Sequence, residues 1–250
     1  YEDAERKETL LDLCRFSTNE NDDPISLSEY LEKMPDNQKD IYYISAETNA
    51  QALASPHLEG FKSKKIPVLI MTDAIDQFWL PMIGSFKEKK FTSITQGKIN
   101  LDDLNSKDKD KKTDNKDQKE KQDKEYVDLI AQLKVVLGEQ VKDIRLSSKL
   151  TDSPVCLVAD EGDMDIAMEQ LMAQRDTNYK GAPRILEING DHSLIKNMKS
   201  LISKKENNDL VNDAGTLLFE QARLMEGKMP ADPAQFSKIM NQFLLKAIPN

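Results

Sequence analysis

The stretch Ser26–Ala46, SLSEYLEKMPDNQKDIYYISA, carries the pattern that decides the fold of the first part of this chain. Four of its apolar residues are spaced as on one face of a helix: Leu27, Tyr30, Leu31 and Met34. Either Ser26 or Ser28 can cap the start of that helix. After a turn, the β-branched and aromatic run Ile41–Ser45 predicts a short strand. Helix, turn and strand in this order predict half of a βαβ layer.

The same alternation continues on both sides of this stretch. The apolar run Val68–Thr72 is typical of a strand buried in a parallel sheet. Other segments of the first hundred residues predict helices at 4–14, 49–54 and 74–86 and a strand at 91–94. The order β-α-β-α-β predicts a three-layer α/β subdomain with right-handed crossovers.

The composition changes sharply after residue 105. Residues 106–125 contain no aliphatic or aromatic side chain, and Lys nearly alternates with Asp and Glu. Such a segment buries too little apolar area to offset the entropy of ordering it, so we expect a solvated linker at 102–125. We expect the last few residues of this linker to form the start of the next helix. A long charged helix is the alternative, because Lys, Glu and Gln are good helix formers.

The remaining half predicts an α+β domain that ends in helices. The pattern indicates helices at 126–137, 164–173, 193–203, 209–226 and 233–247, and strands at 141–146, 155–158 and 184–188. We therefore expect an α/β/α subdomain at 1–101, a charged linker at 102–125 and a second domain at 126–250.

Composition limits the class of protein. The formal net charge of −9 argues against a nucleic-acid partner, which needs clustered Lys and Arg. No run of 18 apolar residues occurs, so no membrane span is expected. Cys14 and Cys156 both lie in apolar surroundings, which predicts two buried, reduced thiols in a cytosolic protein. The chain begins Tyr1-Glu2-Asp3 without a signal pattern, which is typical of a piece of a longer protein.

Catalytic patterns are scarce. The two histidines, His57 and His192, are far apart, and no G-x-S-x-G, H-E-x-x-H or paired C-x-x-C motif occurs. Asp73 and Asp76 follow a buried strand, where they could bind a cation or act as acid and base. They could equally stabilise a helix N-terminus. No Gly-rich phosphate loop follows either main strand. A small α/β enzyme, or a nucleotide- or metal-binding module using these aspartates, is the alternative function.

Two helices carry candidate surfaces for binding proteins. In the helix at 74–86, Ile75, Trp79, Met82 and Ile83 share a face and Phe78 lies beside it. Adjacent aromatics cannot point the same way, so we expect one of Phe78 and Trp79 in the core and the other partly exposed.

The second candidate surface is a methionine stripe. Met164, Met168 and Met172 recur at i, i+4 and i+8 with Leu171 beside them, a pattern suited to varied apolar partners. Packing of this stripe on the chain's own sheet is the alternative.

The last two helices predict an interface. Their apolar faces contain Leu210, Ala214, Leu217, Leu218, Leu224, Phe236, Ile239, Met240, Phe243 and Leu244. A two-fold partner supplying the same hairpin would close a dimeric four-helix bundle. Packing on the chain's own domain explains the same pattern equally well.

Five strings in this chain resemble the 90-kDa heat-shock protein chaperones, in that family's order. They are Arg15–Thr18, Met34–Tyr43, Met71–Asp76, Leu150–Pro154 and Leu186–His192. The resemblance covers essentially the whole chain and implies the end of the family's middle domain followed by its C-terminal dimerisation domain. The enlarged junction at 102–125 departs from the compact junction expected of the family.

The resemblance implies a homodimer that contacts unfolded or partly folded client proteins during the stress response. The client contacts would be Phe78, Trp79, Met164, Met168, Leu171 and Met172. The family's ATP and magnesium site and its catalytic Arg lie upstream of Tyr1, so we expect no enzymatic activity and no cofactor in this piece. The chain ends without the Met-Glu-Glu-Val-Asp tail, which favours a bacterial, cytoplasmic member or an organellar one.

Overall fold

The computed structural model describes residues 6–20, 23–97, 99, 101, 111–175, 181–204 and 208–248. In the helix that begins at residue 111, side chains are described from residue 123 onward. The chain divides into two compact units. Unit 1 comprises residues 1–107 and 159–182, and unit 2 comprises residues 108–158 and 183–250. The expected domain boundaries differ from these units, because residues 159–182 group with the first unit.

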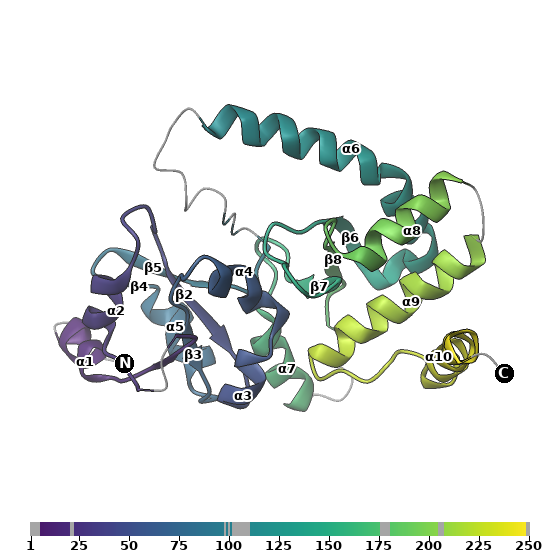
Figure 1. Ribbon diagram of the computed structural model, residues 1–250. Helices are drawn as coiled ribbons and strands as arrows, with labels where there is room; N and C mark the ends of the chain where they lie inside the picture. Colours follow the sequence, from purple (N-terminus) through teal and green to yellow (C-terminus); the bar gives the residue numbers. More distant parts are fainter. Residues whose placement is uncertain are drawn as a thin grey trace. The chain divides into compact units, whose positions relative to one another are not determined.

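Unit 1 is built on a five-stranded sheet in the order β1-β3-β2-β5-β4 (Figure 1). The strands are β1 (Ser17–Thr18), β2 (Ile41–Ser45), β3 (Leu69–Met71), β4 (Ser85–Phe86) and β5 (Lys89–Ser93). The central strand β2 pairs in parallel with β3 and with β5, which confirms the parallel order predicted from the alternation of elements. The short edge strands β1 and β4 pair antiparallel with β3 and β5.

Helices cover both faces of this sheet. Alternate side chains of its strands point to opposite faces, and the apolar side chains on each face pack against helices. Tyr42 and Ile44 pack in a cluster with Phe61 and Leu58, on the side of α3 (Asn49–Leu53), η1 (Pro56–Leu58) and α4 (Glu59–Ser63). Ile41 packs in a second cluster with residues of α1 (Lys7–Leu13), α2 (Leu27–Lys33) and α5 (Asp76–Ile83). Helix α7 (Ile166–Arg175) also belongs to this unit.

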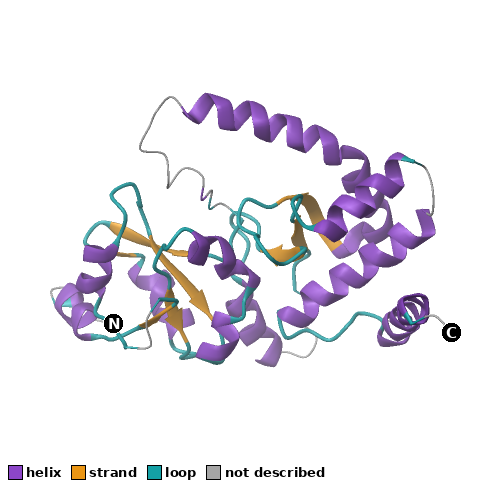
Figure 2. Cartoon of the chain, in the orientation of Figure 1, coloured by secondary structure: helices purple, strands orange, loops and turns teal. Residues whose placement is uncertain are grey.

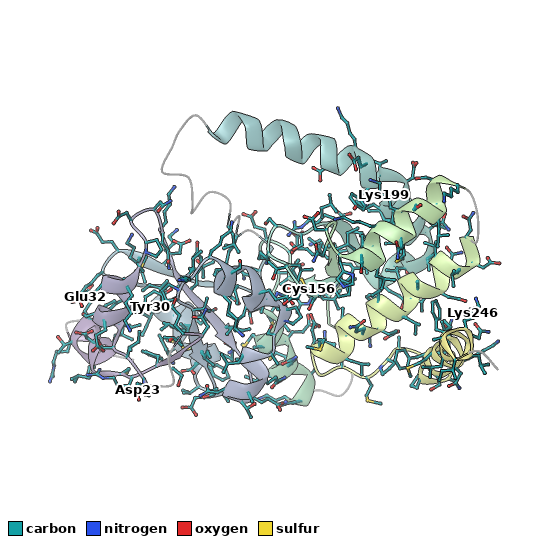
Figure 3. The ribbon with its side chains drawn as sticks, viewed as in Figure 1. Asp23, Tyr30, Glu32, Cys156, Lys199 and Lys246 are labelled. Carbon is teal, nitrogen blue, oxygen red and sulfur yellow. The ribbon has the colours of Figure 1, made fainter. Side chains whose placement is uncertain are left out.

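The stretch that begins the fold is stabilised by local and long-range hydrogen bonds. Ser26 caps α2: its hydroxyl accepts from the Glu29 N–H, and the Glu29 carboxylate accepts from the Ser26 N–H at 2.7 Å. Tyr30, labelled in Figure 3, is buried between α2 and the sheet. Its hydroxyl donates to the Pro67 carbonyl at 2.8 Å and accepts from the Tyr42 N–H at 3.0 Å. One side chain thus joins the helix to β2 and to the segment that leads into β3.

We expect Tyr30→Phe to lower the free energy of unfolding of unit 1 by about 1–3 kcal/mol, since it leaves the buried Tyr42 N–H without its acceptor. Chemical denaturation of the chain measures this. Tyr42→Phe is the matched control: Tyr42 is also buried, and no hydrogen bond from its hydroxyl is seen within the described ranges. Equal losses in both variants would contradict a specific role for the Tyr30 hydroxyl.

Unit 2 contains a three-stranded sheet in the order β6-β8-β7, with helices packed against it (Figure 2). Its strands are β6 (Val141–Leu146), β7 (Val155–Val158) and β8 (Arg184–Ile188), β6 parallel and β7 antiparallel to β8. Its helices are α6 (Lys111–Leu137), η3 (Gly138–Gln140), α8 (Ser193–Ser203), α9 (Asn208–Met225) and α10 (Pro233–Ala247). One hydrophobic core takes side chains from all three strands and from α6, α8 and α9.

The expected linker is wrong over much of its length. Helix α6 begins at Lys111, so residues 111–125 are helical, while residues 102–110 lie outside the described part of the chain. The second half of α6 buries Tyr126, Leu129 and Leu133 in the core. Once that half is fixed, adding charged residues to its start needs no new nucleation, and Lys, Glu and Gln extend a helix readily. The alternative of a long charged helix describes this segment.

Close backbone approach holds α6 and α9 together. Gly215 lies in α9 where a Cβ atom would collide with the buried Leu133 side chain of α6. A second close approach lies at Gly190, beside the ring of Tyr126, whose hydroxyl donates to the Gly190 carbonyl at 2.5 Å. The first contact brings α9 close to α6, and the second brings α6 close to the end of β8.

Two further expectations need correction. Cys156 is buried, as labelled in Figure 3, but Cys14 is exposed at the end of α1. Its apolar neighbours Leu10 and Leu13 are themselves exposed, so the local composition did not indicate a buried position. Helix α5 ends at Ile83 rather than at Phe86, because Gly84 adopts a φ of 71° and the chain turns into β4.

None of the helices in the described part of the chain combines the length and the apolar character that crossing a bilayer requires.

Candidate functional site

The residues that helix α5 buries, and those that it exposes, differ from the expected ones. Leu80 is buried, and Trp79 and Ile83 pack half-buried against the same core cluster. Ile75 and Met82, expected on the face of Trp79, are 52% and 70% exposed. Together with the half-buried Phe78 they form an outward stripe at spacings of three and four residues, which we call the α5 stripe (Ile75, Phe78, Met82).

Trp79 is held in place by its neighbours. Its ring meets the Phe91 ring edge-on at 5.7 Å between centroids and lies 6.2 Å from the Phe16 ring. Its Nε1–H donates to the Asp76 carboxylate at 2.7 Å. Trp79 and Phe78 are both half-buried, so the expected split into one core and one partly exposed aromatic is not observed. Trp79 has the larger share of packing contacts with the core.

Asp76 is engaged in holding this helix. Its second carboxylate oxygen accepts from the Asp73 N–H at 3.2 Å, and the side chain lies in the first turn of α5. Burial raises the pKa of the Asp76 carboxyl, and the hydrogen bonds from Trp79 and Asp73 counteract that rise in part. Among the described residues, no group of three or more His, Cys, Asp or Glu side chains is placed to hold a metal ion. The Asp76 carboxylate is thus engaged with Trp79 and with the Asp73 backbone at the start of α5.

We expect the fluorescence of Trp79, the only tryptophan in the chain, to titrate with a midpoint above the ordinary pKa of an aspartate. The reason is that proton binding removes the charge from the carboxylate that accepts its indole N–H. Since the folded-state pKa is raised, the folded protein binds the proton more readily, and Asp76 contributes less to stability as the pH rises through this window. Asp76→Asn is expected to abolish the transition, and a transition that persists would assign it to another group.

Two buried side chains attach helix α7 to unit 1. Ile166 and Glu169 are buried, and the Glu169 carboxylate accepts from the Ala182 N–H at 3.2 Å. Met164 and Met172 are each 38% exposed, and Met168 and Leu171 are half-buried. At 100° per residue, Met168 and Leu171 lie on the far side of the helix from Ile166 and Glu169, whereas Met172 lies beside Glu169 and Met164 precedes the first helical residue. We call these four apolar residues the α7 stripe (Met164, Met168, Leu171, Met172).

The two stripes approach each other within unit 1. The Arg175 guanidinium of α7 lies over the Phe78 ring of α5, 5.7 Å from its centroid. Arg175 is one and two helical turns beyond Leu171 and Met168, on the same side of α7. The structure therefore brings together the client-contact candidates of both helices. Ile75 and Met82 were missed as members of this surface, although their spacing from Phe78 was the signal that could have found them.

The predicted interface residues in unit 2 fall into two groups. Ala214, Leu218 and Ile239 are buried in the unit itself, and Phe243 packs partly against the same core. For these residues the alternative of packing on the chain's own domain describes their surroundings. The others remain half-buried or exposed: Leu210, Leu217, Leu224, Phe236, Met240 and Leu244.

A pocket of about 450 Å³ opens between α6, α9 and the start of α10. Its charged lining residues are all acidic: Asp213, Glu220 and Asp232. Glu220 is already satisfied, since it accepts from the Ala231 N–H at 3.1 Å and pairs with Arg223 at 3.1 Å. Asp232 caps α10 through the Gln235 N–H. Glu220 and Asp232 thus stabilise the turn between the last two helices.

Comparison with known proteins places this arrangement in a family. The profile of the family described as Hsp90 protein matches residues 1–249. Chaperone protein HtpG of Roseobacter denitrificans is 40% identical over 249 residues, which is 99% of this chain and 40% of the relative. The protein of the same name in Paramagnetospirillum magneticum is 39% identical, over 99% of this chain and 39% of the relative. That of Streptomyces coelicolor is 36% identical, over 95% of this chain and 36% of the relative.

The chain thus spans about two fifths of the length of these relatives, and the family profile covers nearly all of it. A match of this extent agrees with the five strings distributed from Arg15 to His192. The chain belongs to the Hsp90 protein family.

Proposed function

We propose that this chain is the homodimerising, client-binding part of an ATP-dependent chaperone of the HtpG type that acts in protein folding and the stress response. In this proposal residues 1–101 are the end of a middle domain and residues 126–250 are the C-terminal dimerisation domain. Membership of the Hsp90 protein family and the relatives named chaperone protein HtpG support it.

The observation that carries the client-binding role is the pair of adjoining apolar stripes on unit 1. Soluble proteins rarely leave large apolar side chains exposed side by side without a partner. Met82 of the α5 stripe and Met164 and Met172 of the α7 stripe are exposed, and Arg175 over Phe78 joins the two helices. Flexible methionine side chains suit clients of varied sequence. Trp79 supports the α5 stripe from the inner side of the helix, where it contacts Asp76 and Phe91.

The homodimer role rests on the outward face of α10. Met240 and Leu244 are 40% and 51% exposed, and Leu245 and Ile248 continue this apolar surface toward the chain end. The buried Ile239 and the half-buried Phe243 hold the helix on its own unit. A two-fold partner that presents the same face would cover both copies in a four-helix bundle. Dimerisation would also raise the effective concentration of the two client surfaces.

We assign ATP and magnesium to the parent protein and no cofactor or catalytic step to this chain. The loops after β2 and β3 contain no glycine, so they lack the close backbone approach that a phosphate cradle needs. We place the protein in the bacterial cytoplasm, like a chaperone that meets newly unfolded proteins, or in an organelle of bacterial origin.

The chain at micromolar concentration is expected to suppress the aggregation of thermally unfolded citrate synthase, followed by light scattering, equally with and without ATP and magnesium. Sedimentation of the same sample reports the dimer. Failure to suppress aggregation would reject the client-binding role. Saturable, tight nucleotide binding in a calorimetric titration would instead reject the assignment of the nucleotide site to another part of the parent.

A further inference from the structure

We propose that the Thr95 hydroxyl and the Asp165 carboxylate form a latch that holds α7 on unit 1, so that the α5 and α7 stripes form one continuous surface. This inference rests on the proposed client-binding function and assigns positioning residues to it. Neither residue touches the proposed client, and both act through α7.

The latch begins where the chain leaves unit 2. After β7, residues 159–182 join unit 1 although the flanking strands β7 and β8 belong to unit 2. Ala159 forms a parallel bridge with Gln96 next to the end of β5. The Ala159 N–H donates to the Thr95 carbonyl at 3.0 Å, and the Gly97 N–H donates to the Ala159 carbonyl at 2.9 Å. The segment thus enters unit 1 as an added piece of its sheet.

Asp165 then uses its two carboxylate oxygens for different purposes. One accepts from the Ala167 N–H at 2.9 Å and so caps the start of α7. The other accepts from the Thr95 hydroxyl at 2.8 Å. Thr95 is buried and its hydroxyl also lies 2.9 Å from that of Ser93, so its orientation is defined by the end of β5. One side chain therefore starts the helix and fastens it.

Tyr43 of the neighbouring strand β2 lies close enough to Asp165 to feel its charge. Burial raises the pKa of the Tyr43 hydroxyl above its usual range, and the negative charge of Asp165 adds to the rise. At its other end α7 meets α5 through Arg175 and Phe78. Between these ends only Ile166 and Glu169 of α7 are buried. With so little buried apolar area, the position of α7 depends on hydrogen bonds, and those at Asp165 act at its start together with the backbone pairing of Ala159.

The test separates the latch from the helix cap. Thr95→Val removes the donor with nearly unchanged shape, and Asp165→Ser keeps a capping oxygen but lacks the second acceptor for Thr95. In the full chain, both variants are expected to accelerate hydrogen exchange of the α7 amides about tenfold, since a hydrogen bond to a charged group stabilises by about this factor. We expect both to weaken suppression of citrate synthase aggregation, without faster exchange in β2 or β3.

Two controls make the result specific. Thr95→Ser keeps the hydroxyl and is expected to behave like the unmodified chain. Thr92→Val removes a comparable hydrogen bond on the adjoining strand β5, from the Thr92 hydroxyl to Asp40 at 3.2 Å, and is expected to leave α7 unchanged.

The outcomes distinguish the latch from the function on which it rests. Unchanged exchange in α7 overturns the latch. The double variant Met168→Glu, Met172→Glu tests the surface itself. If this double variant lowers suppression while Thr95→Val and Asp165→Ser do not, the client surface is supported and the positioning role of the latch is overturned. If neither lowers suppression although α7 is released, the client-binding proposal fails.

Discussion

Replacing Leu244 with Glu is expected to convert the chain from a dimer to a monomer. Leu244 is exposed on α10 and lies outside the core of unit 2, so the substitution leaves the fold of the protomer intact. In a two-fold interface each substitution counts twice, and burying an unpaired carboxylate costs about 2–3 kcal/mol or more per copy. We therefore expect the dimer dissociation constant to rise by a factor of about a thousand or more.

Sedimentation equilibrium measures this change directly, because one protomer has a mass of 28.4 kDa. Gln242→Glu is the matched control: it adds the same charge to an exposed position on another side of α10 and should leave the dimer unchanged. A monomeric unmodified chain at micromolar concentration would reject the four-helix bundle. Equal masses for the dimeric chain and the Leu244→Glu variant would place the interface elsewhere.

The double substitution Met168→Glu, Met172→Glu is expected to raise about tenfold the chain concentration that gives half-maximal suppression of aggregation. Met168 is half-buried and Met172 is exposed on α7, so the substitutions add two charges to the proposed client surface rather than to a core. Full burial of one such side chain stabilises a complex by about 1.5–3 kcal/mol, and partial burial of two corresponds to roughly a tenfold change in affinity.

The control adds the same charge to the same helix. Ala173→Glu, Gln174→Glu places two carboxylates at exposed positions of α7 outside the stripe and should leave suppression close to that of the unmodified chain. Circular dichroism and sedimentation of both double variants verify that fold and mass are retained. Equal suppression by the two double variants would remove the α7 stripe from the client surface.

Local patterns predicted most elements of this chain. The strand at Ile41–Ser45 is confirmed at the predicted bounds, because a β-branched and aromatic run favours a pleated, buried surface. The last helix is confirmed from Pro233 to Ala247, since Asp232 caps it and a proline at the first position fits its geometry. The turn at Lys87 and Glu88, both with positive φ, carried no glycine signal, and so the β4–β5 hairpin was missed.

The candidate surfaces were predicted in part. Periodicity grouped Met168, Leu171 and Met172, which are half-buried or exposed on α7, whereas Met164 precedes the helix, which begins at Ile166. The same reasoning assigned Ile75 and Met82 to the side of Trp79, whereas both are exposed. Periodicity divides a helix into sides, and a helix such as α5 with apolar residues around most of its circumference gives no basis for choosing the inward one.

The sequence by itself determined the type and order of most elements, the methionine stripe, the apolar faces of the last two helices and the family. These properties depend on residues close together in the chain or on strings read directly. Only the tertiary structure decided that residues 159–182 join unit 1, that Ala214 and Leu218 of α9 face their own core, and that α6 starts at Lys111. Each of these depends on contacts between distant segments, such as Thr95 with Asp165 and Gly215 with Leu133, whose partners no local pattern specifies.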